Sequence, residues 1–457
     1  MGQYSEYGKI EIGDKTLSER VEKTLDQLSS NPTASISAAC QNPHQAKAVY
    51  RLLSNEKFTA EAVIAASRKE TAAKIKESGM RVVLLPQDTT SINYGGLKET
   101  EGLGITNGYK NSRGILLHSS IAVSEEGQIL GLLSEKAWVR PAEELGKRTE
   151  RRKKPVEEKE SNKWLETLDK TDTFSELNDV KFIHICDREG DLYELFAKAE
   201  SDGKTYLCRR CRNRVIEAEA CEIDINRYLS NLTKSGELTV KVPRDSHTNR
   251  ELRTAKLELK YGKANMKKPV GCKQAKPIAK YVEVTLISAK EIDPPVGAKE
   301  INWELVTNDV VETFEDAVKC VNRYTQRWKI EIFHNVLKSG CAIEKLQAST
   351  AGKLIKLIAL YSVISLRIMI LTYLARTLPN DSCEAGFAAD EWKILYKVTK
   401  KTKTLPDKPP TMLEAVIMLS KLGGFLARKS DGFPGVKVIW RGITAFDTIL
   451  DAIAFLS

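Results

Sequence analysis

Four polar residues in the last third of the chain have types and spacing suited to holding and cutting a phosphate backbone. The segment beginning at Phe314 reads FEDAVKCVNRYTQRWKIEIFHNVLKSG and contains Tyr324, Arg327, Glu331 and Lys338. On one continuous helix, at about 100° per residue, these four side chains share a stripe roughly 60° wide. The two cations and the phenol can hold phosphate oxygens, and the carboxylate can hold a metal. The alternative is an exposed helix with incidental charges.

Two upstream carboxylates can complete a metal site. Asp88 ends the strand-like run RVVLLPQD, and Asp187 follows the strand-like run VKFIHIC. Ligands bind beyond strand ends in sheets of this kind, although an aspartate there can equally be a helix cap or turn residue. If Asp88, Asp187 and Glu331 converge, an all-carboxylate site favours Mg²⁺ or Mn²⁺ over Zn²⁺. Two such ions, about 3.5–4 Å apart, activate one oxygen and stabilise another in phosphodiester chemistry.

The elements that would position these residues follow from hydrophobic periodicity. Helical spacing predicts a small helical region over residues 1–70, and helical texture returns at Thr313 and continues almost to the C-terminus. Between these regions the pattern predicts strands, which we expect near 81–90, 114–122, 128–133, 180–186, 205–216, 237–242, 253–260, 281–288 and 301–307.

Composition limits the class of protein. The 457 residues carry a formal net charge of +10, which favours phosphate-bearing partners, and 29% charged residues indicate a soluble globular chain. Nine scattered cysteines and no apolar leader at the N-terminus predict a reducing, cytoplasmic compartment. The apolar run Leu354–Ala375 is interrupted by Lys356 and Arg367, so we expect it to be a buried core helix that does not span a membrane, and we expect no membrane among the partners.

These motifs together resemble those of the DDE transposases of the insertion-sequence-four group, and the chain is similar to the transposon five transposase. The spacing Tyr324-x2-Arg327-x3-Glu331-x6-Lys338 looks like the YREK signature of that family. The two strand-end aspartates resemble its catalytic pair, and the second stands in the sequence Asp187-Arg-Glu-Gly-Asp. The resemblance extends over essentially the whole chain.

The resemblance implies a role for each matching residue. Asp88, Asp187 and Glu331 would be catalytic and would hold two Mg²⁺ or Mn²⁺ ions. The DNA-binding residues it implies are Tyr324, Arg327, Lys338, Trp303, Arg209, Arg20 and Arg51, with His334 as a further candidate. Trp303 would stack on a flipped base, although a buried core tryptophan is the alternative. His334 can likewise simply pack.

The implied fold is α/β: an RNase H-like mixed-sheet core with a β-rich insertion and helical domains at both ends. The implied divisions are 1–70 (DNA binding), 71–204 (core), 205–310 (insertion), 311–375 (core, with the YREK helix) and 376–457 (dimerisation). The implied activity is cut-and-paste transposition, in which a homodimeric synaptic complex nicks transposon ends, forms and opens hairpins, and joins the ends to target DNA.

Other functions remain open at this stage. An RNase H-like nuclease or resolvase could use the same core, and a truncated transposition inhibitor could bind DNA without cutting it. The pair Cys208 and Cys211 invites a zinc site, but a structural site needs four ligands and no second such pair is present.

Overall fold

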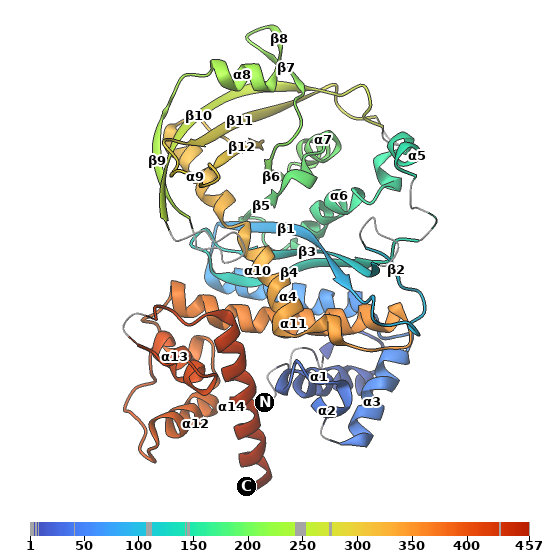
Figure 1. The fold of residues 1–457 in the computed structure, drawn as a ribbon, viewed down its shortest axis with the longest axis vertical. Helices are drawn as coiled ribbons and strands as arrows, with labels where there is room; N and C mark the ends of the chain where they lie inside the picture. The colour runs from blue at the N-terminus through green and yellow to red at the C-terminus, as the bar shows by residue number, and fades with distance from the viewer. Residues whose placement is uncertain are drawn as a thin grey trace. The chain divides into compact units, whose positions relative to one another are not determined.

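The computed structural model describes residues 4, 7, 9–40, 42–106, 112–141, 143, 147–242, 253–273, 277–428 and 431–456. The chain forms two compact units. The first contains residues 1–80, 89–145 and 329–457, and the second contains residues 81–88 and 146–328. Figure 1 labels the elements of both.

The first unit contains both helical ends of the chain. Its helices are α1 (Lys15–Ser30), α2 (Ile36–Ala39), α3 (Pro43–Ser54), α4 (Ala60–Ser78), most of α10 (Trp328–Asn335), α11 (Ala351–Thr377), α12 (Ala389–Lys400), α13 (Met412–Leu422) and α14 (Val436–Leu456). Its strands are β2 (Gly104–Ile105), β3 (Arg113–Val123), β4 (Ile129–Trp138) and the second half of β1 (Val82–Asn93).

Local sequence signals explain the N-terminal helices. The side chain of Asp14 accepts a hydrogen bond from the Leu17 amide and caps α1, and the side chain of Asn42 caps α3 ahead of Pro43. The apolar face of α1, which includes Val21, is fully buried. These helices confirm the expected helical texture of this region.

Helix α4 packs on β4 through unusually close contacts. The Arg68 Nε donates to the Leu133 carbonyl at 2.7 Å, and the Thr71 hydroxyl donates to the Leu132 carbonyl at 3.2 Å. A Cβ on Gly131 would lie 1.9 Å from the Thr71 oxygen, so only glycine allows this approach. The helix is thereby fixed directly to the strand backbone.

Helix α11 is the apolar core helix of this unit. It is long and apolar enough to cross a membrane, but 78% of its most apolar window is buried inside the protein. Burial on nearly all sides explains why the segment is hydrophobic all round.

The second unit is built on one extended mixed sheet. Its strands are the first half of β1, β5 (Lys181–Cys186), β6 (Thr205–Arg209), β7 (Val215–Ala218), β8 (Cys221–Asp224), β9 (Gly236–Val242), β10 (Arg253–Lys267), β11 (Tyr281–Glu291) and β12 (Asn302–Thr307). Its helices are α5 (Arg148–Lys153), α6 (Asn162–Asp169), α7 (Tyr193–Ser201), α8 (Ile225–Asn231) and α9 (Phe314–Thr325).

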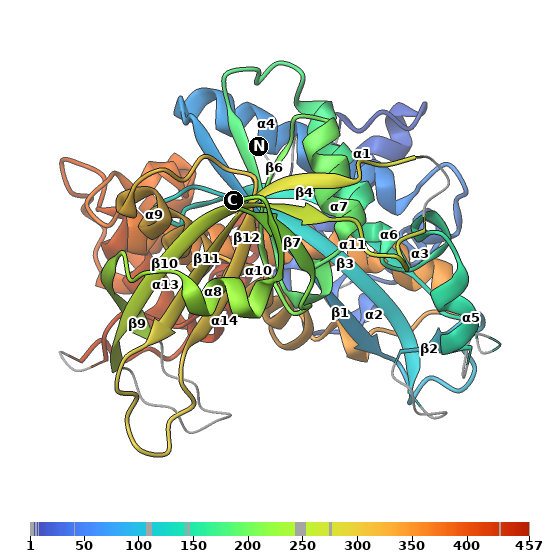
Figure 2. The same cartoon turned by 90° about the horizontal axis from the view of Figure 1, so that it is seen from above.

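The order within this sheet is β1-β5-β6-β12-β11-β10-β7-β8, with β9 pairing β10. Strands β1, β5 and β6 are parallel, and β12 then pairs antiparallel to β6. Strands β9, β10 and β11 lie side by side, as Figure 2 shows from above, and α8 packs on β10 and β11. In the first unit, β3 lies next to β1 and β4 pairs antiparallel to β3. The expected mixed α/β fold with a β-rich insertion and helical ends is confirmed.

Two local expectations were wrong. Strand β1 does not end at Asp88 but continues to Asn93, because the segment Thr89–Ile92 is rich in residues that favour strands. The expected continuous helix from Phe314 is also broken. It ends as α9 at Thr325, and Arg327 lies in a turn before α10.

The break changes the helix-face argument. The amides of Gln326 and Arg327 donate to the carbonyls of Arg323 and Tyr324, three residues back, which tightens the chain into a turn. After α10, residues Val336–Gly340 form a π-helix. A single 100° step therefore does not describe the segment from Tyr324 to Lys338, although hydrophobic Ile330, Phe333 and Leu337 are buried as expected.

Candidate active site

The two aspartates lie near the same level of the second unit's sheet: Asp88 is on β1, and Asp187 directly follows β5, the parallel neighbour of β1. Strand β1 pairs with β5 so that Pro86 lies opposite Ile185. Continued for two residues beyond this pair, the register places Asp88 of β1 opposite Asp187, which directly follows β5. Neighbouring strands are about 4.8 Å apart, so the two carboxylates can act on one substrate group.

The turn after β5 fixes the second aspartate. One Asp187 oxygen accepts the Glu189 amide at 2.8 Å, which caps a short 3₁₀ turn and leaves the other oxygen for a ligand. The turn needs glycine at position 190, since a Cβ there would lie 2.6 Å from the Cβ of Cys186. The alternative interpretation of Asp187 as a cap is thus correct for one oxygen, and it is compatible with metal binding by the other.

Arg327 joins the first aspartate to a group of aromatic rings. Its Nη1 lies 4.0 Å from an Asp88 oxygen, and its guanidinium carbon lies 5.9 Å from the centre of the Tyr324 ring. The Tyr324 ring in turn meets Trp303 edge-on, with ring centres 5.8 Å apart. Tyr324 is buried, and this burial raises the pKa of its phenol. The tyrosine therefore stays neutral and can donate a hydrogen bond.

Trp328 is a residue that the sequence argument missed. The Arg327 guanidinium carbon lies 5.1 Å from its ring centre, and 43% of Trp328 is exposed. An exposed indole beside a buried arginine has the chemistry that base stacking uses. The sequence did contain one signal for Trp328, since this residue directly follows Arg327 of the signature.

Arg209 lies at the end of β6 in the same unit. Its Nη2 donates to the Asn302 carbonyl at 2.9 Å. Burial has the larger effect on the pKa of Tyr324 and raises it, while the positive charge of Arg209 acts in the opposite direction. The structure therefore brings together Arg209, Trp303, Tyr324 and Arg327 among the expected site residues of this unit.

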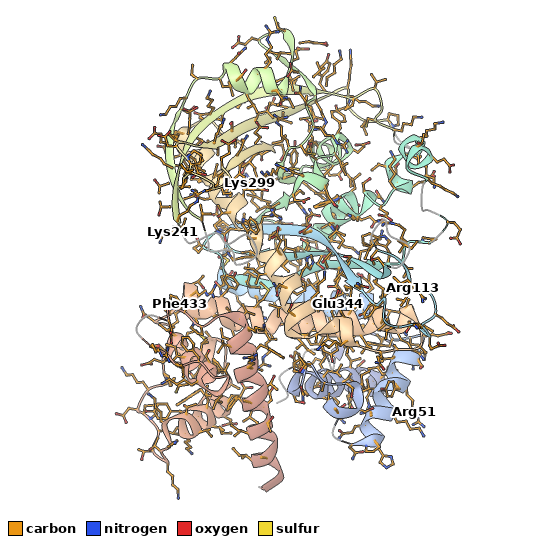
Figure 3. The ribbon with its side chains drawn as sticks, viewed as in Figure 1. Arg51, Arg113, Lys241, Lys299, Glu344 and Phe433 are labelled. Atoms are coloured by element: carbon orange, nitrogen blue, oxygen red, sulfur yellow. The ribbon has the colours of Figure 1, made fainter. Side chains whose placement is uncertain are left out.

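The remaining signature residues belong to the first unit. Glu331 is half-buried on α10. Lys338 lies in the π-helix, where burial lowers the pKa of its ammonium and Glu344 opposes that effect. Glu344, labelled in Figure 3, accepts the Asn93 amide at 2.8 Å. Burial lowers the pKa of His334 to about 3, so this histidine is neutral at physiological pH and packs beside Phe333.

Two family models match the helical ends of the chain. The model for the transposase DNA-binding domain matches residues 4–58, and the model for the transposase Tn5 dimerisation domain matches residues 363–455. The chain therefore has terminal regions similar to the DNA-binding and dimerisation domains of Tn5-type transposases. It is also similar to a solved structure described as a piggyBac transposase synaptic complex with hairpin DNA, at 9% identity and a TM-score of 0.35, over 80% of this chain and 67% of that one.

The region matched by the transposase DNA-binding model contains the two expected N-terminal arginines. Arg20 lies half-buried on α1, and Arg51 is exposed on α3, where Figure 3 shows it at the outer edge of these helices. Arg51 lines an open hollow of about 340 Å³ together with Lys47 and Tyr50. The hollow presents two cations and an exposed aromatic ring to solvent.

The donor set of the candidate site suits hard divalent cations. Within the described residues, no group of three or more His, Cys, Asp or Glu side chains is already close enough together to hold a metal ion. Asp88 and Asp187 still offer oxygen atoms on adjacent strands, and an oxygen-only set fits Mg²⁺ or Mn²⁺. The metal role of Asp88, Asp187 and Glu331 stays a prediction. Among the described residues, Cys208 and Cys211 belong to no group of three or more potential metal ligands, and their thiols donate to the carbonyls of Asp187 and Arg188, so the zinc alternative gains no support.

Proposed function

We propose that the chain is a metal-dependent DNA transposase that nicks transposon ends, forms and opens hairpins at them, and joins the ends to target DNA. The observation that carries this proposal is the parallel register of β1 and β5, which brings Asp88 and the residue that follows β5, Asp187, to the same level, with Arg327 4.0 Å from Asp88. The transposase DNA-binding and dimerisation domains support DNA and a second copy as partners.

Asp88, Asp187 and Glu331 would hold two divalent ions, which supply an activated water or hydroxyl and stabilise the leaving oxygen. The chain's own groups bind and orient the strand. Arg327 and Lys338 would hold non-bridging phosphate oxygens, and Tyr324 would donate its phenolic hydrogen to the same backbone. Trp303 would stack on a base turned out of the helix next to the cut.

Substitution of one carboxylate tests this mechanism. We expect Glu331→Gln to abolish Mg²⁺-dependent nicking of duplex DNA carrying the transposon end, while affinity for that DNA stays within about threefold. Glu315→Gln is the matched control, because Glu315 is an exposed carboxylate on the preceding helix α9. Nicking by Glu331→Gln at the rate of the control would overturn the assignment.

Product analysis separates transposition from the other activities. A transposase should give nicked, hairpin and strand-transfer products in sequence from one labelled end. Nicks alone would indicate a nuclease or resolvase. Binding of DNA with no cleavage in either Mg²⁺ or Mn²⁺ would indicate an inhibitor.

A further inference from the structure

Asp191 is a fully buried carboxylate that closes the turn containing Asp187. Its Oδ2 accepts the amides of Cys211 and Arg212 at 2.7 and 2.8 Å. Its Oδ1 forms an ion pair with Arg214, whose side chain is only 4% exposed. Since both oxygens are already occupied by donors, Asp191 is not available as a metal ligand, although it stands four residues from Asp187.

Further contacts join the same two segments of chain. The Arg214 Nη2 donates to the carbonyl of Asp191 at 2.8 Å. The thiol of Cys208 donates to the Asp187 carbonyl at 3.4 Å, and that of Cys211 to the Arg188 carbonyl at 3.2 Å. The backbone of the aspartate turn is thus held by residues 208–214 at three carbonyl groups.

The segment held by Asp191 also contacts the strand that contains Trp303. Arg210 forms an ion pair with Glu304, and its amide donates to the Glu304 carbonyl at 2.9 Å. Arg209 donates to the Asn302 carbonyl on the other side of Trp303. One continuous set of contacts therefore runs from the aspartate turn, through residues 209–214, to β12.

We infer that Asp191 is a positioning residue that locks the Asp187 turn to the arginine segment 209–214, so that the metal-binding aspartate and the DNA-contacting strand keep a fixed separation. The inference rests on the proposed function for its consequence in cleavage. The physical reason is that a carboxylate with three internal donors holds both segments rigidly, and its loss leaves the buried Arg214 without its counter-charge.

Asp191→Asn is the direct test, because asparagine keeps the shape and one acceptor oxygen but removes the charge. Glu291→Gln is the matched control. Glu291 is buried at the end of β11, pairs with Arg253, and accepts the Ile301 amide at 2.9 Å. Both variants break a buried arginine–carboxylate pair in the same unit, so both should lower the melting temperature.

Only Asp191→Asn should change the site. We expect the Mn²⁺ concentration for half-maximal nicking to rise at least tenfold, and the amides of Glu189, Cys211 and Arg212 to exchange hydrogen at least tenfold faster. Glu291→Gln should keep wild-type values in both measurements. If Asp191→Asn is too unstable, Arg214→Lys provides a milder loss of the same contacts and should move both values in the same direction.

The outcomes separate the two hypotheses. Wild-type metal dependence and wild-type amide exchange in Asp191→Asn, or the same changes in Glu291→Gln, would overturn the positioning role. Absence of metal-dependent nicking by the wild-type chain would instead overturn the proposed function. In that case the exchange measurement alone still decides whether Asp191 locks the two segments.

Discussion

The guanidinium of Arg327 lies 4.0 Å from the carboxylate of Asp88, between the first candidate metal ligand and two aromatic rings. An arginine in this position can orient the carboxylate and still offer hydrogen-bond donors to a phosphate. Its flat face against the rings fixes that orientation in a way that a lysine cannot reproduce.

Replacement of Arg327 by lysine should therefore impair cleavage severely. We expect Arg327→Lys to slow single-turnover nicking of end DNA by about a hundredfold, the size of effect seen when one charge-stabilising donor is lost. Arg323→Lys is the control, because Arg323 forms a comparable pair with Asp309 at 2.9 Å on the preceding helix. Equal rates for the two variants would mean that Arg327 is only structural.

The hydroxyl and the ring of Tyr324 should have separable effects. Tyr324→Phe keeps the packing against Trp303, so the free energy of unfolding should change little, while affinity for end DNA falls. Tyr324→Ala removes a buried ring and should cost about 3–5 kcal/mol in a urea titration. Tyr206→Phe is the control, since Tyr206 is equally buried on β6. A loss of DNA affinity in that control too would show that the Tyr324 hydroxyl has no specific role.

Glu135 should make the stability of the first unit depend on pH. Burial raises the pKa of this carboxyl to about 8, even though Ser362 and Ser119 donate to it at 2.7 and 3.5 Å. The pKa of Glu135 in the folded protein is above its unfolded value of about 4.5. The neutral carboxyl therefore makes its full contribution to the free energy of unfolding below about pH 4.5, and this contribution is lost as the pH rises towards 8.

Urea unfolding at pH 5, 6.5 and 8 measures this effect. The free energy of unfolding of the wild type should fall over this range, and Glu135→Gln should flatten the fall because glutamine does not ionise. Glu237→Gln is the control: two lysines lower the pKa of Glu237 to about 2, so it titrates below the range tested. A wild-type slope in Glu135→Gln would rule out Glu135 as the cause.

Lys356 should stabilise the end of α3 in the DNA-binding domain. Its ammonium donates to the carbonyls of Leu53 and Asn55 at 3.0 and 2.8 Å, and it lies 5.9 Å from the ring centre of Phe58. Lys356→Met leaves these carbonyls without a charged donor and should cost about 1–3 kcal/mol.

Faster hydrogen exchange at the end of α3 and weaker binding of end DNA should accompany this loss of stability. Lys353→Met serves as the control, because Lys353 lies one turn earlier on α11 and its ammonium donates to the Ser349 hydroxyl at 3.1 Å, outside α3. If the control shows the same changes, the effect belongs to helix α11 and not to the contacts with α3.

Much of the fold was predictable because short-range patterns determined it. The capping box of Thr313 and Asp316 marks the start of α9, and Asn42 with Pro43 marks the start of α3. Alternating and apolar runs predicted most of the strands, but they missed the short strands β2 and β8 and joined β6 and β7 into one strand over 205–216. The candidate site residues Asp88, Asp187 and Glu331, separated by long stretches of chain, also came from the sequence and its family resemblance, and their catalytic role stays a prediction.

Tertiary structure alone decided how those residues are presented. Helical periodicity assumes an unbroken helix, so it could not reveal the turn at Arg327 or the π-helix around Lys338, which depend on packing against the rest of the protein. The β1–β5 register that places Asp88 beside Asp187 is a long-range pairing between strands about one hundred residues apart. The burial of Asp191 with Arg214, and the exposure of Trp328, follow from the same long-range packing.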